Sequence, residues 1–286
     1  MDLDFTDDEI TRYSRNILLT EVGGAGQARL RAARVLIVGA GGLGSPLALY
    51  LAAAGIGTLG LVDDDRVELS NLQRQVAHTT DRVGMAKVDS AAAACRAINP
   101  GVTVETHAAR LTADNAMALV GAYDLVCDGS DNFPTRFLVA DACALAGRTL
   151  VSAAVLRFDG QLSTFKPHVG QGGVGQGGLS QGGAGGPCYR CLHPAPPPDG
   201  LVPTCGEAGI LGAVTGVMGT LQATEVLKEV MGIGEGLSGR LLVWDALAAR
   251  VRTIRLPRDP ACALCGPNAT IHDLSAHRRA EPALAG

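Results

Sequence analysis

The segment Val35-Leu36-Ile37-Val38-Gly39-Ala40-Gly41-Gly42-Leu43-Gly44 is an apolar run that leads directly into a glycine turn. The run is typical of a buried parallel strand, and the residues after the turn have a helical pattern. A strand, a tight glycine turn and a helix N-terminus place backbone N–H groups and a positive dipole end where phosphate oxygens can bind. This segment therefore predicts a nucleotide phosphate site.

A second apolar run, Leu59 to Val62, ends at Asp63, where dinucleotide-binding folds carry the acid for a ribose hydroxyl. The glycine turn alone has low specificity, because redox, transferase and isomerase folds share it. It can also pack a helix tightly onto a strand without any ligand. No Gly-Lys-Ser/Thr motif follows the turn, so an ATP ligand would need its charges met by residues elsewhere.

Helical and strand patterns alternate along most of the chain. We expect strands at 34–39, 58–63, 102–106, 124–128 and 149–155, with helices at 42–54, 86–98, 112–121 and 133–146 between them. This order predicts a doubly wound, Rossmann-like α/β fold with a mainly parallel sheet. A short turn before residues 160–165 predicts that the sheet becomes mixed on its C-terminal side. Further expected elements are helices at 7–31 and 206–230 and strands near 240–245 and 250–256.

Composition narrows the class of protein. The 286 residues carry a net charge of -4 and only 3% aromatic residues, which argues against a nucleic-acid partner. No apolar run approaches the ~20 residues that span a membrane, and the acidic N-terminus is unlike a secretory signal, so we expect a cytoplasmic protein. We expect one domain over residues 1–267, interrupted by a flexible Gly/Gln/Pro-rich crossing loop at 169–200. Residues 268–286 read as a disordered tail.

Polar residues beyond the second strand can supply the charges that the glycine turn lacks. The run Ser70-Asn71-Leu72-Gln73-Arg74-Gln75 follows that strand, and Lys87 begins the next helix. A guanidinium fork and an ammonium point charge suit a triphosphate. Taken singly, each of the two cations is better explained as a solvated surface charge, and only the set as a whole favours a phosphate site.

Asp131 and Asn132 follow the strand at 124–128, at the edge where ligands bind in open α/β sheets. An aspartate there suits Mg²⁺, which prefers one or two carboxylates together with phosphate oxygens and water. The alternative is that either side chain caps the helix that starts near residue 133.

The chain has eight cysteines. Two Cys-x-x-Cys pairs have the spacing of a closed, tetrahedral, structural zinc site, although redox pairs or buried thiols are the alternatives. Cys205 lies in a loop before a long helix, where a thiol could be activated as a nucleophile or have no role. The expected zinc ligands are Cys188, Cys191, Cys262 and Cys265, and the expected core thiols are Cys95, Cys127 and Cys143.

Taken in order, these motifs resemble the ThiF/MoeB/HesA family of adenylyltransferases, which are related to ubiquitin-activating enzymes. The resemblance runs from about Arg12 to Gly266 and includes the segments Arg12 to Arg15, Pro187 to Cys191 and Thr204 to Gly209. Among subgroups the chain is most similar to the molybdopterin-synthase adenylyltransferases. The resemblance implies ATP-dependent adenylylation of the C-terminal glycine carboxylate of a small ubiquitin-like sulfur carrier, with release of pyrophosphate, for molybdenum cofactor biosynthesis.

The resemblance also implies roles for particular residues. Arg74 would contact phosphates, Lys87 would add positive charge, and Asp131 would hold Mg²⁺. Arg15 would reach the phosphates bound by the other subunit of a homodimer, and Cys205 would form a covalent link with the carrier. The four paired cysteines would hold structural Zn²⁺. The implied ATP-binding set is Gly42, Asp63, Ser70, Asn71, Leu72, Gln73, Arg74, Lys87, Asp131 and Asn132.

The expected partner is a carrier with a Gly-Gly C-terminus. No sulfurtransferase domain follows Cys265, so a separate sulfurtransferase is expected. The same chemistry on the thiamine-pathway sulfur carrier is the first alternative. An NAD-dependent oxidoreductase, supported only by the glycine turn and Asp63, is a remote one. A non-catalytic binding module is a third, but it would have no reason to retain the charged residues.

Overall fold

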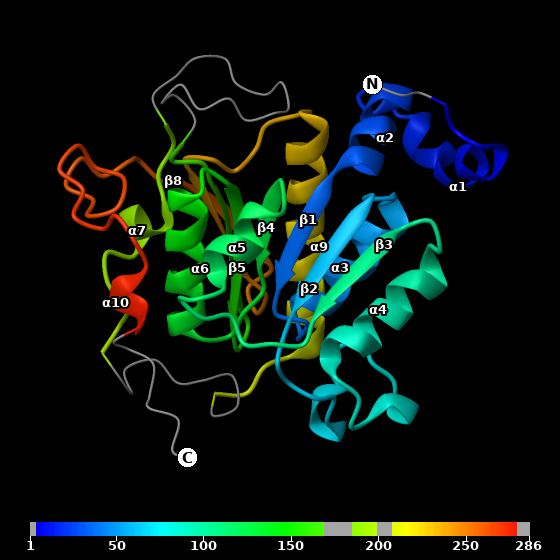
Figure 1. The fold of residues 1–286 in the computed structure, drawn as a ribbon, viewed down its shortest axis with the longest axis horizontal. Coiled ribbons are helices and arrows are strands. Elements are labelled where there is room, and N and C mark those ends of the chain that lie inside the picture. The colour runs from blue at the N-terminus through cyan, green and yellow to red at the C-terminus, as the bar shows by residue number, and fades with distance from the viewer. Residues whose placement is uncertain (1–3, 169–184, 199–207, 279–286) are drawn as a thin grey trace.

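The chain is built on one eight-stranded sheet. The computed structural model describes residues 4–168, 185–198 and 208–278, and the sheet has the order β3-β2-β1-β4-β5-β6-β7-β8 (Figure 1). The strands are β1 (Arg34–Val38), β2 (Thr58–Val62), β3 (Thr103–His107), β4 (Leu125–Asp128), β5 (Thr149–Leu156), β6 (Asp159–Phe165), β7 (Arg240–Asp245) and β8 (Arg250–Arg255). Strands β1 to β5 pair in parallel, and β6 to β8 are antiparallel. The predicted mixed, doubly wound sheet is confirmed.

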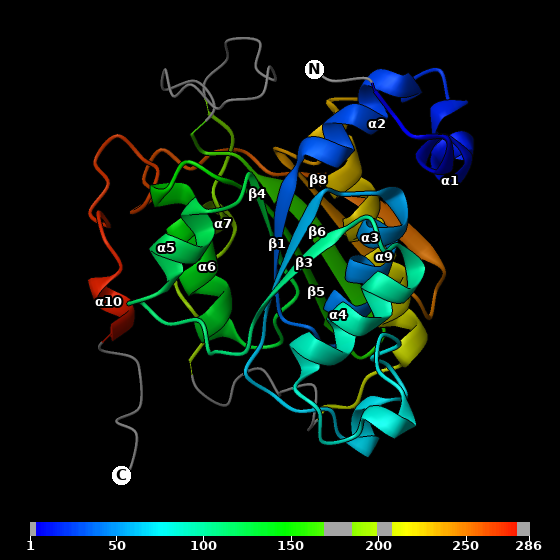
Figure 2. The same ribbon diagram turned by 45° about the vertical axis from the view of Figure 1, so that its right-hand side comes forward.

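Helices cover both faces of the sheet. Figure 2 shows α5 and α6 on one side and α3, α4 and α9 on the other. The helices are α1 (Asp7–Ile17), α2 (Gly23–Ala32), α3 (Gly44–Ala54), α4 (Lys87–Ile98), α5 (Ala116–Gly121), α6 (Phe133–Leu145), α7 (Tyr189–Leu192), α9 (Gly212–Met231) and α10 (Ser275–Arg278), with 3-10 turns η1 (Leu69–Asn71) and η2 (Thr80–Arg82). Within the described ranges, none of these helices has the combined length and apolar character that crossing a bilayer requires.

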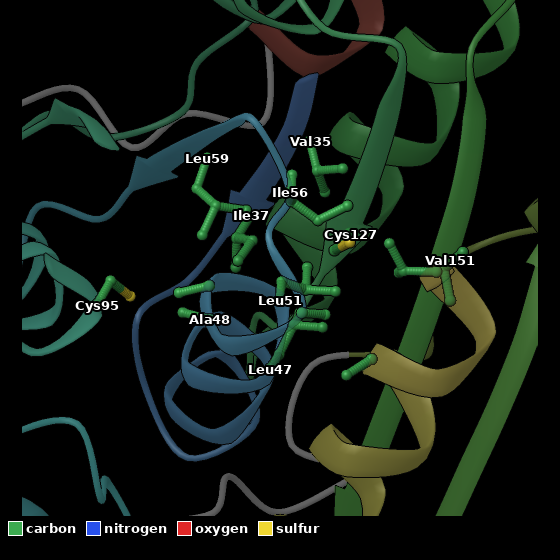
Figure 3. Close-up of a cluster of buried hydrophobic side chains, with 14 of the residues drawn as sticks. Val35, Ile37, Leu47, Ala48, Leu51, Ile56, Leu59, Cys95, Cys127 and Val151 are labelled. Carbon is green, nitrogen blue, oxygen red and sulfur yellow. The ribbon is translucent and has the colours of Figure 1, made fainter. Parts of the chain in front are cut away.

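The first strand explains why the sheet is buried on both faces. Its side chains alternate, so that Val35 and Ile37 pack in the cluster under α3 and α9, while Leu36 and Val38 pack in the cluster under α5 and α6. Figure 3 shows part of the first of these clusters, with Val35 and Ile37 of β1 and Leu51 of α3 labelled. The glycine turn after β1 is therefore anchored on a strand that has no exposed face.

The N-terminal region differs from the expected single helix over 7–31. Helix α1 ends at Ile17 and α2 starts at Gly23, whose φ of +53° lies in the left-handed region. Two successive glycines at this point favour a break, because glycine has low helix propensity and adopts positive φ without strain. A capping box between Thr6 and Glu9 fixes the start of α1.

The segment after Asn268 also differs from expectation. Residues 268–278 were expected to be a disordered tail, but they are described and end in the short helix α10. His277 Nε2 lies 2.8 Å from Oδ2 of the buried Asp141, and Arg278 pairs with Asp114. Such polar contacts between distant residues have no periodic pattern, so they cannot be recognised from the sequence. Residues 279–286 lie outside the described residues, as do 169–184 and 199–200 of the expected crossing loop.

Candidate nucleotide site and cysteine cluster

A cavity of about 290 Å³ lies at the carboxyl ends of β1, β2 and β4, beside the glycine turn. Side chains from chain segments that are far apart in sequence line it. Six of the residues predicted from the sequence are among them: Gly42, Asp63, Arg74, Lys87, Asp131 and Asn132. The fold therefore brings together most of the predicted nucleotide-binding residues.

The glycine turn is fixed from both sides of its backbone. Ala40 N donates to Asp63 Oδ2 at 2.8 Å, and His78 Nε2 lies 3.0 Å from Ala40 O. Gly39 has a φ of +92°, and a Cβ on Gly44 would lie 1.8 Å from the carbonyl oxygen of Gly39. Only glycine fits at position 44, so the turn can bring its backbone N–H groups close to a ligand at the start of α3.

Lys87 is a buried cation of the cavity, not a solvated surface charge. It is the first residue of α4, its side chain is 8% exposed, and its Nζ lies 2.6 Å from Asp65 Oδ2. Burial raises the pKa of Asp63, and the nearby Lys87 ammonium opposes that shift. A positive charge held in this position is available to an anionic ligand.

Asp63, Asp64 and Asp65 bring three carboxylates within 4.8 Å of one another. Several of their oxygens already have partners, because Asp63 accepts from the backbone N–H groups of Ala40 and Asp65, and Asp65 pairs with Lys87. These bonds hold the loop after β2 in place. The cluster is consequently better explained as support for the turn and for Lys87 than as a cation site.

The other predicted residues differ in whether they line the cavity. Arg74 lines the cavity and donates to Ser70 O at 3.1 Å. Asn132 Oδ1 accepts from Thr135 N at 2.9 Å, so Asn132 caps α6 as the structural alternative proposed, whereas Asp131 is exposed at the cavity. The cavity lining does not include Ser70, Asn71, Leu72 or Gln73.

Asn71 has a structural task in that run. Its Oδ1 accepts from Glu68 N at 3.2 Å and closes the η1 turn from which Arg74 extends. Gln73 packs against the start of α9, where a Cβ on Gly212 would lie 2.2 Å from Gln73 O. The segment thus shapes the wall that carries Arg74.

Arg15 lies far from the cavity of its own chain. It is exposed on α1, and the neighbouring Arg12 donates to the carbonyl oxygen of Ile98, the last residue of α4. Lys87 is at the other end of this 12-residue helix, about 17 Å away at 1.5 Å per residue. Figure 1 shows α1 at the edge of the molecule opposite the glycine turn.

A second cavity of about 430 Å³ adjoins the first. Strands β5, β6 and β7 and helix α7 contribute to its wall, and three residues line both cavities: Asp131, Arg136 and Val155. Its lining mixes apolar side chains such as Leu162 and Val243 with polar ones such as Gln161 and His193. The two cavities therefore meet at the N-terminal end of α6.

The four paired cysteines gather into one cluster. The Sγ atoms of Cys188 and Cys262 are 3.4 Å apart, as are those of Cys191 and Cys265, and all four lie within 4.8 Å of one another. Four thiolates around a zinc ion with Zn–S bonds of about 2.3 Å would be about 3.8 Å apart. The donor set and its spacing fit a closed, structural Zn²⁺ site.

The remaining cysteines divide into two groups. Cys95, Cys127 and Cys143 are fully buried in the two hydrophobic clusters, which confirms that they are core residues. Burial raises the pKa of Cys95 to about 12, which keeps the thiol protonated. Cys205 lies outside the described residues.

Comparison with known proteins places the chain in a family. Residues 13–264, nearly the whole length, match the model of the ThiF family. The chain belongs to the ThiF family. It is 56% identical over 268 residues to the bovine adenylyltransferase and sulfurtransferase MOCS3, covering 93% of this chain but only 55% of that protein. It is 48% identical over 270 residues to a sulfur carrier protein adenylyltransferase of Thermus thermophilus, covering 94% of this chain and 96% of that one.

A solved structure shares the fold. The E. coli protein MccB superposes with a TM-score of 0.75 at 23% identity, covering 94% of this chain and 75% of that one. The resemblance to this family that the motifs indicated is thus confirmed for fold and family. The chain spans about half the length of curated relatives such as bovine MOCS3.

Several residues of this ThiF-family site were missed in the sequence. Asp128 is 1% exposed, and its carboxylate accepts from Ser130 Oγ at 2.6 Å and Ser152 Oγ at 2.8 Å. Arg136 Nη2 donates to Ser130 O at 2.7 Å. Arg136 could have been found from the sequence, because it lies one helical turn after Asn132, which was already predicted to be at the site.

Gln75 belongs to the polar run singled out in the sequence, but it was not among the predicted ATP-binding residues. Only 4% of it is exposed, it lines the first cavity, and its Oε1 has no hydrogen-bond partner within the described part of the chain. A buried amide oxygen without a partner is costly unless a ligand or water meets it. This orphaned oxygen is consistent with a polar ligand in the first cavity of the ThiF-family fold.

Proposed function

We propose that the protein is an ATP-dependent adenylyltransferase that activates the C-terminal glycine carboxylate of a small ubiquitin-like sulfur carrier. The observation that carries this proposal is the first cavity, where Arg74, Lys87 and Asp131 meet a glycine turn that has no P-loop lysine. The printed names of the bovine and Thermus relatives support the reaction and the carrier class.

The chemistry needs positioning and charge rather than a general base. A C-terminal carboxylate is ionised at neutral pH, so one of its oxygens can attack the α-phosphorus directly. The bond from that phosphorus to the bridging oxygen breaks, and its electron pair leaves with pyrophosphate. Glycine-turn N–H groups, Arg74 and Lys87 would stabilise the charge that builds up on the leaving group.

Two metal ions belong to the proposal. Asp131, an exposed carboxylate at the first cavity, would hold Mg²⁺, and the ion would neutralise part of the phosphate charge. The cysteine cluster would hold Zn²⁺ in a structural role, because four sulfur ligands leave no open position. The cysteines described in the structure are all free of disulfides, in keeping with a cytoplasmic location.

The second cavity offers an approach for the carrier. It adjoins the first along the sheet, so a chain end that enters it would meet the nucleotide at the junction. A Gly-Gly end suits such a passage, because it carries no side chains. The carrier used in molybdenum cofactor biosynthesis is the first candidate, and the thiamine-pathway carrier is the alternative, with sulfur supplied by a separate sulfurtransferase.

We also propose a homodimer in which Arg15 of one subunit completes the site of the other. Arg15 is exposed on α1, one turn after Arg12, which contacts the end of α4 remote from the cavity, and this position supports a role at a phosphate in a neighbouring chain. Under the NAD-dependent alternative, Arg74, Lys87 and Asp131 would share no role in hydride transfer, and only the turn and Asp63 would be explained.

ATP–pyrophosphate exchange across a panel of carriers with Gly-Gly ends tests the proposal. We expect exchange that requires both a cognate carrier and Mg²⁺. Absence of exchange with every carrier, together with tight binding of NADH, would favour the oxidoreductase. A parallel series with Cys205→Ala shows whether that thiol takes part in activation, since exchange precedes any covalent link to it.

A further inference from the structure

The junction between the two cavities has a distinctive charge pattern. Arg74, Arg110 and Lys87 line the first cavity alone, whereas Arg136 lines both. Among the described residues it is the only cation common to the two linings. A positive charge at this point faces the nucleotide on one side and the open approach on the other.

Arg136 is held in place without being neutralised. Its Nη2 donates to Ser130 O at 2.7 Å, and Ser130 is in turn bonded to the buried Asp128. The ion pairs found within the described ranges do not include Arg136. By contrast, Arg190 pairs with Asp141 through two bonds of 2.7 Å. Arg136 is therefore a positioned guanidinium that lacks a carboxylate partner.

Arg136 shares the wall of the second cavity with other polar side chains. Tyr189 and His193 both line that cavity. Because Arg136 lines it too, its positive charge is available to a ligand that enters there.

An incoming carboxylate needs such a charge at this point. Asp131 and Asp159 also line the second cavity, so an anionic chain end would meet two negative side chains before reaching the nucleotide. A guanidinium binds a carboxylate through two parallel N–H···O bonds and fixes its plane. An isolated ammonium would supply attraction but not this orientation.

We propose that Arg136 receives the C-terminal carboxylate of the carrier and orients it toward the α-phosphorus. The inference rests on the proposed function and names the residue that binds the adenylyl acceptor, the carrier carboxylate, in it. Arg136 transfers no proton: a carboxylate oxygen bonds to phosphorus, and the electron pair of the broken P–O bond leaves with pyrophosphate. Its contribution is binding and alignment of the attacking group.

The test uses the carrier that supports pyrophosphate exchange, prepared with a C-terminal carboxylate or a C-terminal carboxamide. Binding of each form to the full chain is measured by calorimetry in the presence of a non-hydrolysable α,β-methylene ATP analogue. Wild-type protein is expected to prefer the carboxylate form by about tenfold or more, the value of charge-assisted hydrogen bonds. Arg136→Gln is expected to bind the two forms within about twofold of each other and to bind the ATP analogue as wild type does.

Arg110→Gln is the matched control, because it removes one positive charge from the first cavity alone. It is expected to keep the preference for the carboxylate. Arg136→Met is a second neutral variant for use if Arg136→Gln does not fold. The inference is overturned if either Arg136 variant keeps the full preference for the carboxylate form, or if the wild-type protein shows no preference although it supports pyrophosphate exchange. Absence of exchange with every carrier overturns the proposed function and this inference with it.

Discussion

Lys87→Met is expected to abolish most activity while leaving the fold intact. The Lys87 side chain is 8% exposed inside the first cavity, so solvent does not replace its charge when a triphosphate binds. Removing one pre-positioned donor from such a site typically slows a reaction by about 10²–10³, or about 3–4 kcal/mol of transition-state stabilisation. We expect this loss in kcat/KM for carrier-dependent pyrophosphate exchange.

The expected effect on stability is small, although the lysine is buried in an ion pair. Its partner Asp65 is 66% exposed, so the carboxylate left behind is solvated and carries no burial penalty. The free energy of unfolding should change by less than about 1 kcal/mol, which shifts the melting temperature by only a few degrees. Methionine fills much of the volume of the lysine stem.

Lys166→Met is the matched control, with the opposite expected pattern. Lys166 pairs with Glu229, which is 8% exposed, and neither residue lines the first cavity. Removing this lysine leaves a buried carboxylate without its partner, so stability should fall while the exchange rate stays close to that of the wild-type protein. An exchange rate within tenfold of wild type in a folded Lys87→Met variant would refute the assignment of Lys87 to the phosphates.

Three further predictions concern other parts of the molecule. Burial holds the pKa of His78 below its ordinary value of about 6.5, so protonation of this side chain favours the unfolded state. The wild-type protein should therefore lose stability as the pH falls below 6.5, by up to about 1.4 kcal/mol of unfolding free energy per pH unit. Urea unfolding at several pH values should show a shallower loss for His78→Gln, and an equal slope would contradict this. Cys262→Ser should lose bound zinc and melt at a lower temperature, while affinity for an ATP analogue stays within about twofold, because the cluster packs on Ala144 and Leu145 and not on the cavity. Metal analysis and calorimetry check this, and zinc-free protein of unchanged stability would argue against it. Mixing inactive Arg15→Ala and Lys87→Ala chains should restore about one quarter of the activity, since half the dimers would each carry one intact site; no recovery after subunit exchange would exclude the shared site.

Much of the fold could be predicted from the sequence because the patterns that indicate it involve residues close together in the chain. The apolar run of β1, the glycine turn and the alternating βα pattern each depend on neighbouring residues, and the register of the sheet follows from them. The break between α1 and α2 was missed although Gly23 and Gly24 lie at it, because the apolar spacing continues on both sides. The prediction relied on this continuous spacing and did not take into account that two adjacent glycines favour a break in a helix.

The candidate nucleotide site could be predicted only in part, because its geometry depends on contacts between segments that are far apart in the sequence. Lys87 and Asp131 were found from their places at a helix start and a strand end. Asp128, in contrast, looked like the last residue of a strand, and nothing nearby shows that its carboxylate binds Ser152, which is 24 residues away. Packing alone likewise decides whether a charged residue lines one cavity or both.

The buried carboxylate of Asp141 has a consequence for how this chain can be shortened. Asp141 is 0% exposed and binds two groups: Arg190, which lies between Cys188 and Cys191, and His277 of α10. One side chain thus connects the core helix α6, the cysteine cluster and the last described turn of the chain. Trimming the protein soon after Gly266 would remove one of these contacts and open the other to water. A stable shortened form should therefore retain residues up to Arg278, even though the sequence predicts that these residues belong to a disordered tail.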